Sequence, residues 1–175
     1  FYYNLIYQFP ETFTKKVGLK KIYDSFPWSK DKDKFQKWCE GETGFPIVDA
    51  SMKNLNKTGY MPNRSRLIVA NFLTKILRID WTWGEKYFAQ QLVDYSVSNN
   101  LGNWQWVASI GADYQNRIYN PMSQSAKSDP DCEYIKEWIP VLKDVPNKDV
   151  HNWSTKYGKY TIDYPEPMVN YPEEY

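Results

Sequence analysis

Residues 66–79 place the strongest constraint on the fold, because the run RLIVANFLTKILRI is apolar on nearly every side of a helical projection. A surface helix carries one apolar stripe, whereas a helix that is apolar all round has to be buried. We therefore expect a buried helix over about 64–79. No alternating strand pattern longer than four residues occurs along the chain, although half-buried strands would produce one. The sequence predicts an all-α protein.

Signals that start and stop helices divide the rest of the chain. Proline is favoured in the first turn of a helix and glycine just past its end, so Pro46 and Gly59 predict a helix over 46–58. The motif Thr82-x-x-Glu85 reads as a capping box that opens a helix through Leu92 and Val93. Further helices are expected over 1–9, over 31–40, over 103–110 and from Asp129-Pro130 to about Ile139, with a loop at 10–30 and an irregular tail wrapping the surface over the last 30 residues.

The length of 175 residues suits one domain with a substantial core. The chain starts at Phe1 rather than Met, which predicts an excerpt from a longer protein. No apolar run of 18 residues and no signal-peptide pattern occur. We therefore expect no membrane partner and an intracellular location (cytoplasm, nucleus or viral factory) rather than secretion. A formal net charge of +1 excludes a bulk polycation but allows a local basic patch.

The cysteine and histidine content excludes several kinds of site. Cys39 and Cys132 are far apart and in no C-x-x-C pair, and His151 is the single histidine. Because zinc sites need clusters of these residues, we expect no metal and reduced thiols. The sequence also lacks the G-x-G-x-x-G, G-x-x-x-x-G-K-[ST] and G-x-S-x-G motifs. A self-contained Rossmann or P-loop enzyme is thereby excluded.

Arginine is scarce here, and its positions are informative. Only four of the 22 basic residues are arginines, at 64, 66, 78 and 117, in a chain rich in Lys, Asn and Tyr. Such a composition resembles that of an AT-rich genome, in which a retained arginine indicates a need for its planar, bidentate fork. Arg64 and Arg66 lie only two residues apart.

The segment 94–106 (DYSVSNNLGNWQW) is rich in side-chain amides between apolar flanks. It reads either as an Asx-rich loop that caps the next helix or as the lining of a pocket for a polar heterocycle. Asp94 and Arg66 would form a natural ion pair there. From the residues alone both interpretations stay open.

Aromatic residues make up 18% of the chain, and most of them suit a packed core. Trp28, Trp81 and Trp104 fall in three separate segments, each after polar or turn residues, and fit either a core or an electron relay. A second group fits either scattered surface charge or a phosphate-binding face with stacking rings. Its members are Arg64, Arg117, Lys53, Lys57, Lys127, Tyr60 and Trp106.

Several motifs resemble the flavin domain of DNA photolyases and cryptochromes, in order and with the family's spacing. The longest is TGYMPNRSR at 58–66, which continues through Phe72-Leu73 to Ile79-Asp80-Trp81. The others are G-x-x-GFPIVDA at 41–50, GEKYF at 84–88, NWQW at 103–106, RIYNP at 117–121 and WIP at 138–140. The resemblance covers about residues 1–172. It implies the C-terminal portion, the FAD-binding helical half, of a class I-like cyclobutane pyrimidine dimer photolyase.

The resemblance assigns roles residue by residue. FAD contacts are implied for Asn63, Arg66, Asp94, Ser96 and Asn100, with Asn100 opposite the flavin N5 and Ser96 where the family usually has a second aspartate. Electron transfer is implied for Asn100 and for the series Trp104, Trp81 and Trp28. For the substrate, the family implies that Trp106 stacks on the flipped-out dimer and that Leu67 faces it in place of the common Met. Arg64 and Arg117 would hold DNA phosphates.

The implied activity is light-driven repair of cyclobutane pyrimidine dimers in ultraviolet-damaged DNA, by electron transfer from reduced FAD. This is the reaction of a deoxyribodipyrimidine photo-lyase, a carbon–carbon lyase. The alternatives are a cryptochrome-like blue-light photoreceptor and a catalytically silent remnant. Asn100 and Trp106 count against a photoreceptor. Intact Arg66 and Asp94 count against a remnant, and Ser96 counts slightly for one.

Family members also carry segments that these 175 residues lack. These are an N-terminal α/β antenna domain, a Ser/Thr-rich loop for the FAD phosphates and a Trp-Arg pair just before the position of Phe1. The resemblance therefore implies a domain truncated at its N-terminus, with the missing N-terminal half as a partner and no antenna chromophore bound to this segment.

Overall fold

The computed structural model describes residues 1–11, 19–20, 25–113 and 115–171, and this part of the chain is helical without strands. One isolated bridge, between Ser29 and Ile79, is its only sheet-like pairing. The predicted all-α class is confirmed. The main helices are α1 (Tyr2–Gln8), α3 (Lys32–Glu40), α4 (Pro46–Thr58), α5 (Asn63–Asn71), α6 (Trp81–Gln91), α7 (Val97–Val107), α8 (Pro121–Ser128), α9 (Glu133–Trp138), α10 (Asn147–His151) and α11 (Trp153–Lys156).

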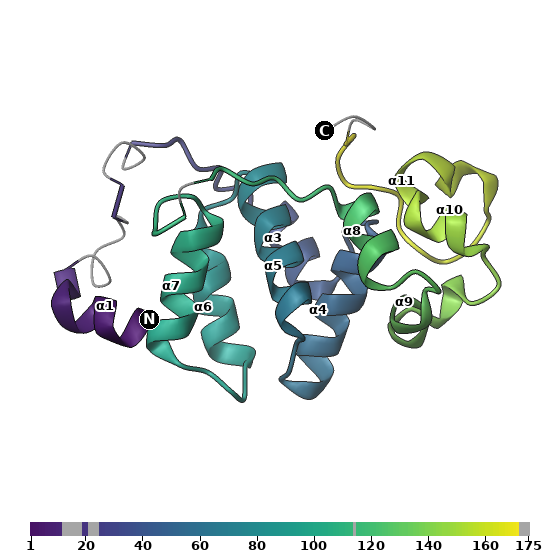
Figure 1. Ribbon diagram of the computed structural model, residues 1–175. Coiled ribbons are helices and arrows are strands. Elements are labelled where there is room, and N and C mark those ends of the chain that lie inside the picture. Colours follow the sequence, from purple (N-terminus) through teal and green to yellow (C-terminus); the bar gives the residue numbers. More distant parts are fainter. Residues whose placement is uncertain (12–18, 21–24, 114, 172–175) are drawn as a thin grey trace.

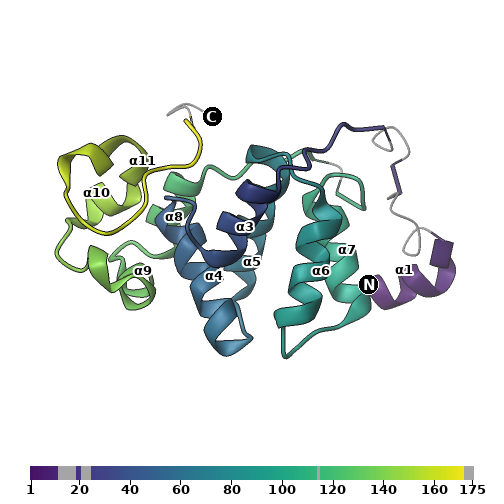
Figure 2. The same cartoon turned by 180° about the vertical axis from the view of Figure 1, so that it is seen from behind.

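The helices form an elongated array with α1 at one end and α10 and α11 at the other (Figures 1 and 2). Helix α4 is central and packs against α3, α5, α8, α9 and α10. Helices α6 and α7 pair with each other, and α7 also packs against α5 and α1. The buried Trp38 of α3 ties the layers together, because its indole Nε1 donates to the Val69 carbonyl of α5 at 3.0 Å. In the described part of the chain, no helix is long and apolar enough to cross a membrane.

The predicted buried helix over 64–79 is confirmed in position, but it is not one continuous α-helix. Helix α5 passes into a π-helical turn, η2 (Phe72–Ile76), and the chain then turns at Arg78, whose φ is 55°. Residues 68–74 are all buried, as a helix that is apolar all round requires. Single π turns inside α-helices are often found at functional sites, and this one contains Lys75.

Two predicted helix starts are wrong. The cap of α6 is Asp80, whose carboxylate accepts from the Thr82 backbone N–H at 2.9 Å, and Thr82 is not the capping residue. Glu85 therefore takes no part in a capping box. The helix expected at 103–110 begins at Val97 and ends at Val107, so most of the amide-rich segment after Asp94 is helix rather than loop. Side-chain amides face a ligand as readily from a helix as from a loop, and composition alone does not distinguish the two.

The predicted ends of α3 and α4 are confirmed, whereas the boundaries predicted near the C-terminus are not. Helices α3 and α4 end at Gly41 and Gly59, both in the left-handed conformation. The helix predicted to start at Asp129-Pro130 begins only at Glu133, with Cys132 at the N-cap position, although the Asp129 carboxylate accepts from the Tyr134 and Ile135 backbone N–H groups of its first turn. Most of the loop predicted at 10–30 lies outside the described residues. Helix α8, capped by Asn120, was not anticipated.

The last 30 residues, expected to be irregular, contain the short helices α10 and α11, and the stretch after them is fastened to the start of α4 and the segment before it. The carboxylate of Asp49, fully buried in α4, accepts from the backbone N–H groups of Thr43 and Gly44, the Thr43 hydroxyl and the Tyr164 hydroxyl. The backbone N–H of Met168 donates to the Thr43 carbonyl at 2.9 Å. These bonds hold residues 164–168 of the tail on the 43–49 segment.

Candidate functional site

An open pocket lies between α5 on one side and α6 and α7 on the other, and its empty space, counted out into open solvent, is about 660 Å³. Phe88, Leu92 and Val107 supply apolar wall, and polar groups converge from α5, from the α6–α7 connection and from α7. The lining includes all five residues for which FAD contacts are implied, Asn63, Arg66, Asp94, Ser96 and Asn100, and also Leu67, Asn99, Asn103 and Trp104.

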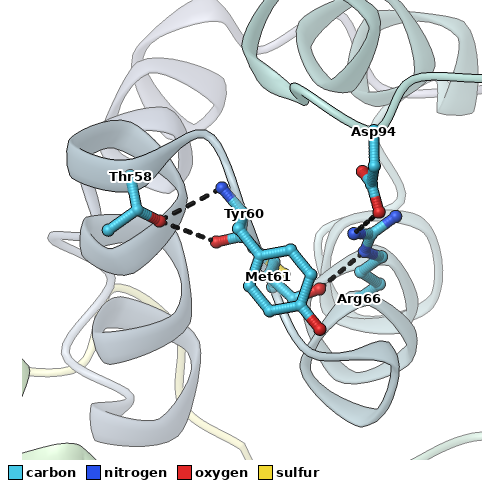
Figure 3. Close-up of polar contacts among 5 residues, drawn as sticks. All are labelled: Thr58, Tyr60, Met61, Arg66 and Asp94. Atoms are coloured by element: carbon cyan, nitrogen blue, oxygen red, sulfur yellow. Dashed lines mark hydrogen bonds and ion pairs between the residues drawn. The ribbon is translucent and has the colours of Figure 1, made fainter.

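The predicted ion pair at the pocket mouth is confirmed. The Arg66 guanidinium Nη2 lies 2.7 Å from Asp94 Oδ2, and its Nε donates to the Met61 carbonyl at 2.7 Å. Figure 3 shows Arg66 held from both sides, with the Tyr60 ring alongside. The guanidinium carbon lies 5.7 Å from the centre of that ring.

This ion pair orients groups more than it stabilises the fold. The side chains are 26% and 47% exposed, and exposed pairs contribute at most about 1 kcal/mol. With Nε and one Nη directed to Met61 and Asp94, the rest of the Arg66 fork stays available at the pocket. The arrangement matches the inference that a retained arginine here is one whose planar fork is needed.

The turn that precedes α5 sets the position of Met61 and Tyr60. The Thr58 hydroxyl accepts from the Tyr60 backbone N–H at 3.1 Å and lies 3.2 Å from the Tyr60 carbonyl (Figure 3). Gly59, between them, has a φ of 71°, a left-handed conformation that residues other than glycine rarely adopt. The TGYMP motif therefore forms a turn that directs the Met61 carbonyl toward Arg66.

Asn100 has a defined orientation in the pocket wall. Its amide Nδ2 donates to the backbone carbonyl and to the carboxylate Oε1 of Glu85, both at 3.1 Å. Because both partners are acceptors, the nitrogen must face Glu85. The amide oxygen is thereby left as the atom available to a ligand. Burial raises the pKa of the Glu85 carboxyl, and the hydrogen bond from Asn100 opposes that rise.

Glu85 does not line the pocket, but it holds the pocket residue Asn100, a role that sequence reasoning missed. The spacing Thr82-x-x-Glu85 suggested a capping role, and nothing in the sequence links Glu85 to Asn100, fifteen positions later. Only the packing of α6 on α7 brings them together. Ser96 also has an unanticipated partner, because its hydroxyl lies 3.0 Å from the hydroxyl of Tyr3 on α1.

The three tryptophans of the predicted relay lie in linked positions. The Trp104 indole packs on α6, since a Cβ built on Gly84 would come within 2.2 Å of its Cη2 atom. Trp81, one turn before Gly84, begins the same helix. The Trp28 segment pairs with the chain next to Trp81, through Ser29 N–H to the Arg78 carbonyl at 2.7 Å. Trp104 lines the pocket, Trp104 and Trp81 are buried, and Trp28 is partly exposed, whereas the relay and its order stay predictions.

Two members of the predicted phosphate-binding group, Arg117 and Trp106, lie together, with the guanidinium carbon 5.4 Å from the indole centre. The buried Asn71 of α5 fixes the Arg117 backbone, because it donates to the Arg117 carbonyl at 2.9 Å and accepts from the Tyr119 N–H at 2.8 Å. Arg64 is exposed in the first turn of α5. Lys57, in contrast, lies 5.8 Å from the Trp138 ring of α9, where it serves packing between α4 and α9.

The pocket can do a limited kind of chemistry. It presents a cation, a carboxylate, an amide oxygen and further amides around an apolar wall, which suits a flat heterocycle with alternating donors and acceptors. Within the described residues, no group of three or more His, Cys, Asp or Glu side chains is placed to hold a metal ion. Burial raises the pKa of the Cys39 thiol to about 12, and that of Cys132 to about 11, which suits unreactive thiols.

Comparisons with known proteins show the family of the chain. The family described as the FAD binding domain of DNA photolyase matches residues 1–175. The deoxyribodipyrimidine photo-lyase of Vibrio cholerae is 49% identical over 149 residues, covering 84% of this chain and 32% of its own length. Cryptochrome DASH of Natronomonas pharaonis is 42% identical, covering 94% of this chain and 36% of its own length. The crystal structure of the archaeal photolyase from Sulfolobus tokodaii, with two FAD molecules, superposes with a TM-score of 0.87 at 46% identity, over 95% of this chain and 38% of that one.

Fold and pocket together define an all-α domain of the photolyase and cryptochrome class. The predicted resemblance is confirmed. The chain belongs to the family of the FAD-binding domain of DNA photolyase. It spans about a third of the length of the curated relatives it matches.

Proposed function

We propose that this chain is the flavin half of a light-driven photolyase that repairs cyclobutane pyrimidine dimers in DNA. The observation that carries the proposal is the convergence on one pocket of two separate segments, which supply Asn63 and Arg66 from α5 and Asp94, Ser96 and Asn100 from residues 94–100. The family and the relatives named photo-lyase support the same activity. Because its substrate is DNA, we further propose an intracellular location. We also propose that residues 1–175 are one domain of a longer enzyme whose N-terminal half completes the cofactor site.

The donor set of the pocket fits a flavin. A flavin ring carries carbonyl oxygens and ring nitrogens along its edge, and Arg66, the asparagine amides and the Asn100 oxygen offer the complementary groups. Bound in its reduced form and excited by light, FAD supplies the electron that opens the dimer. Asn100 would offer its amide oxygen to the N5 edge of the ring, because its nitrogen donates to Glu85. Arg66 and Asp94 flank the ring and keep its edge oriented.

The remaining proposed roles are carried by side chains outside the flavin contacts. Trp104, Trp81 and Trp28 relay an electron from the surface toward the pocket. Trp106 stacks on the flipped-out dimer, whose weak stacking and pairing lower the cost of flipping. Leu67 faces the same cavity. Arg64 and Arg117 hold phosphates, which gives affinity without sequence preference.

The test uses the protein that carries this chain, supplied with FAD and a thymine-dimer oligonucleotide. We expect a flavin absorbance spectrum, loss of the dimer under blue light and none in the dark. Trp106→Ala is expected to weaken dimer binding at least about fivefold, because stacking on one base contributes about 1–3 kcal/mol. Lys143→Asn, a change at an exposed residue outside the pocket, serves as the control.

Two other outcomes have distinct meanings. Binding and photoreduction of FAD without repair would favour a cryptochrome-like photoreceptor, a candidate that the match to a cryptochrome DASH supports. Failure to bind FAD, also with the N-terminal half present, would favour a silent remnant.

A further inference from the structure

A second pocket, of about 580 Å³, opens at the surface end of the tryptophan series. It shares no described lining residue with the first pocket. Trp28 and its neighbour Phe26 form one wall, with ring centres 4.5 Å apart. Lys75, Arg78, Ser109 and Asn116 line the rest together with Thr74.

The polar side of this pocket is cationic. Lys75 Nζ donates to the Ser109 hydroxyl at 2.6 Å and to Asn116 Oδ1 at 2.8 Å, both neutral acceptors. Among the described residues, neither Lys75 nor Arg78 forms an ion pair within 4.0 Å.

The charges around Lys75 act in opposite directions. Burial lowers its pKa to about 8, the charge of Asp113 raises it and the charge of Lys20 lowers it. Asp113 is itself buried, and its Oδ1 accepts from the Gln115 N–H at 3.0 Å. The groups that face the opening are therefore the two cations and neutral hydrogen-bonding groups, a combination that favours an anion.

The backbone around the pocket is unusual. Three described residues other than glycine have positive φ, and two of them, Arg78 (55°) and Ser109 (64°), line this pocket. The π turn η2 supplies Thr74 and Lys75. Such conformations cost free energy and cluster at functional sites. Arg78 is also the one arginine of the four that the proposed function leaves without a role.

We propose that this second pocket binds a small planar anion with an oxidisable ene-diol group, which returns an electron to Trp28. This inference rests on the proposed electron relay. A flat conjugated anion satisfies both walls, because it stacks on Trp28 and meets Arg78 and Lys75 at its edge. Trp28 is partly exposed, so a ligand in the pocket reaches the ring directly.

The step is balanced as a one-electron transfer. After Trp28 has passed an electron inward, its indole is a radical cation. An ene-diol monoanion then gives one electron to the indole and one proton to water, and becomes a radical monoanion. Trp28 returns to its neutral form, no bond to the protein forms, and the ligand is the reductant.

The binding test uses ascorbate as the probe, in the dark and without oxygen. The indole N–H signal of Trp28 is followed by nitrogen–proton correlation spectroscopy and assigned with Trp28→Phe. We expect a saturable shift, and Arg78→Asn should weaken binding about tenfold, the equivalent of one charge-assisted hydrogen bond. Asparagine tolerates the positive φ at this position. Lys143→Asn, at an exposed position outside this pocket, is expected to bind ascorbate as the wild type does.

A redox measurement completes the test. In the flavin-loaded protein, ascorbate should shorten the lifetime of the Trp28 radical with saturation in the wild type and without it in Arg78→Asn. The proposal is overturned by a linear, non-saturating shift, by equal binding to Arg78→Asn, or by inorganic phosphate binding as tightly as ascorbate. Binding is read without light, so a failure of the electron relay itself would show separately, as an absent radical beside intact ascorbate binding.

Discussion

At the residue scale, Glu85 decides which atom Asn100 presents to the pocket. An asparagine amide can offer its oxygen or its nitrogen, and the two acceptors of Glu85 select the oxygen. Glu85 is a positioning residue in this sense, since it acts on the ligand through Asn100. Its partly buried carboxyl suits the role, because a hydrogen bond in a drier setting is stronger.

Glu85→Ala is therefore expected to lower FAD affinity about fivefold, the equivalent of one hydrogen bond of about 1 kcal/mol. The backbone carbonyl of residue 85 still accepts in this variant, which limits the loss. Glu85→Gln retains a side-chain acceptor and should bind nearly as the wild type does. Titration of FAD by fluorescence measures both. Equal losses in the two variants would contradict the orienting role.

Lys75 supplies a pH-dependent prediction. Its pKa is about 8 in the folded protein and 10.5 in an unfolded chain, mainly because burial disfavours its charge. Between these values the unfolded state binds more protons, so the contribution of Lys75 to stability rises with pH. The free-energy cost of burying the charged Lys75 ammonium is fully present below pH 8 and is relieved by about pH 10.5.

Urea unfolding of the wild type and Lys75→Met at pH 7 and pH 9.5 measures this effect. The stability of the wild type relative to the variant is expected to increase at the higher pH. The comparison cancels the tyrosines and thiols that titrate in the same range in both proteins. A stability difference that stays constant with pH would show that Lys75 has an ordinary pKa.

At the element scale, the contact between α6 and α7 shapes both the pocket and the tryptophan series. Gly84 makes the close approach possible, because its missing side chain leaves room for the Trp104 ring and for Leu73 of η2. Sequence rules treat a glycine inside a helix as a weak point. At this position the packing makes glycine the more stable choice, because a larger side chain would clash.

Gly84→Ala is expected to destabilise the fold by about 2 kcal/mol, although alanine normally favours a helix interior by about 1 kcal/mol. The added Cβ would lie 2.2 Å from Trp104 Cη2 and 2.6 Å from Leu73 Cδ2. Gly158→Ala is the matched control, since no atom lies within 4 Å of its added Cβ. Urea denaturation compares the two. A stabilised Gly84→Ala would show that α6 and α7 are farther apart than described here.

At the scale of the whole molecule, the buried carboxylate of Asp49 is one of the groups that hold the tail. Full burial raises the pKa of this carboxyl, and four hydrogen bonds from its neighbours oppose the rise. The Tyr164 hydroxyl stays protonated as a donor, because burial and the nearby Asp49 charge raise its pKa well above its ordinary value. Residues 115 positions apart are joined by this bond.

Tyr164→Phe is expected to cost about 1–3 kcal/mol, because it leaves a buried carboxylate short of one donor. Limited proteolysis should cut the tail faster in this variant. Tyr157→Phe, at a residue 37% exposed, should change stability by less than about 0.5 kcal/mol. If both variants unfold at the same urea concentration, the Asp49–Tyr164 bond does not fasten the tail.

Much of this protein was determined by its sequence alone. The all-round apolar run required a buried helix, and proline and glycine marked the ends of α3 and α4, because these signals act within a few residues of the chain. The ion pair of Arg66 with Asp94 was also predicted. Family motifs indicated the flavin class, since the residues of a motif reflect tertiary contacts that rules for helices and turns do not describe.

Only the tertiary structure decided the rest. Asp80 rather than Thr82 caps α6, and α7 starts six residues early, because several polar residues in each segment were equally suitable as caps and packing chose among them. The partner of Asn100, the space above Gly84, the fastening of the tail and the cationic pocket beside Trp28 all join residues distant in sequence. Such pairings arise when helices pack and leave no periodic trace, so the sequence specified the elements and the packing specified the sites.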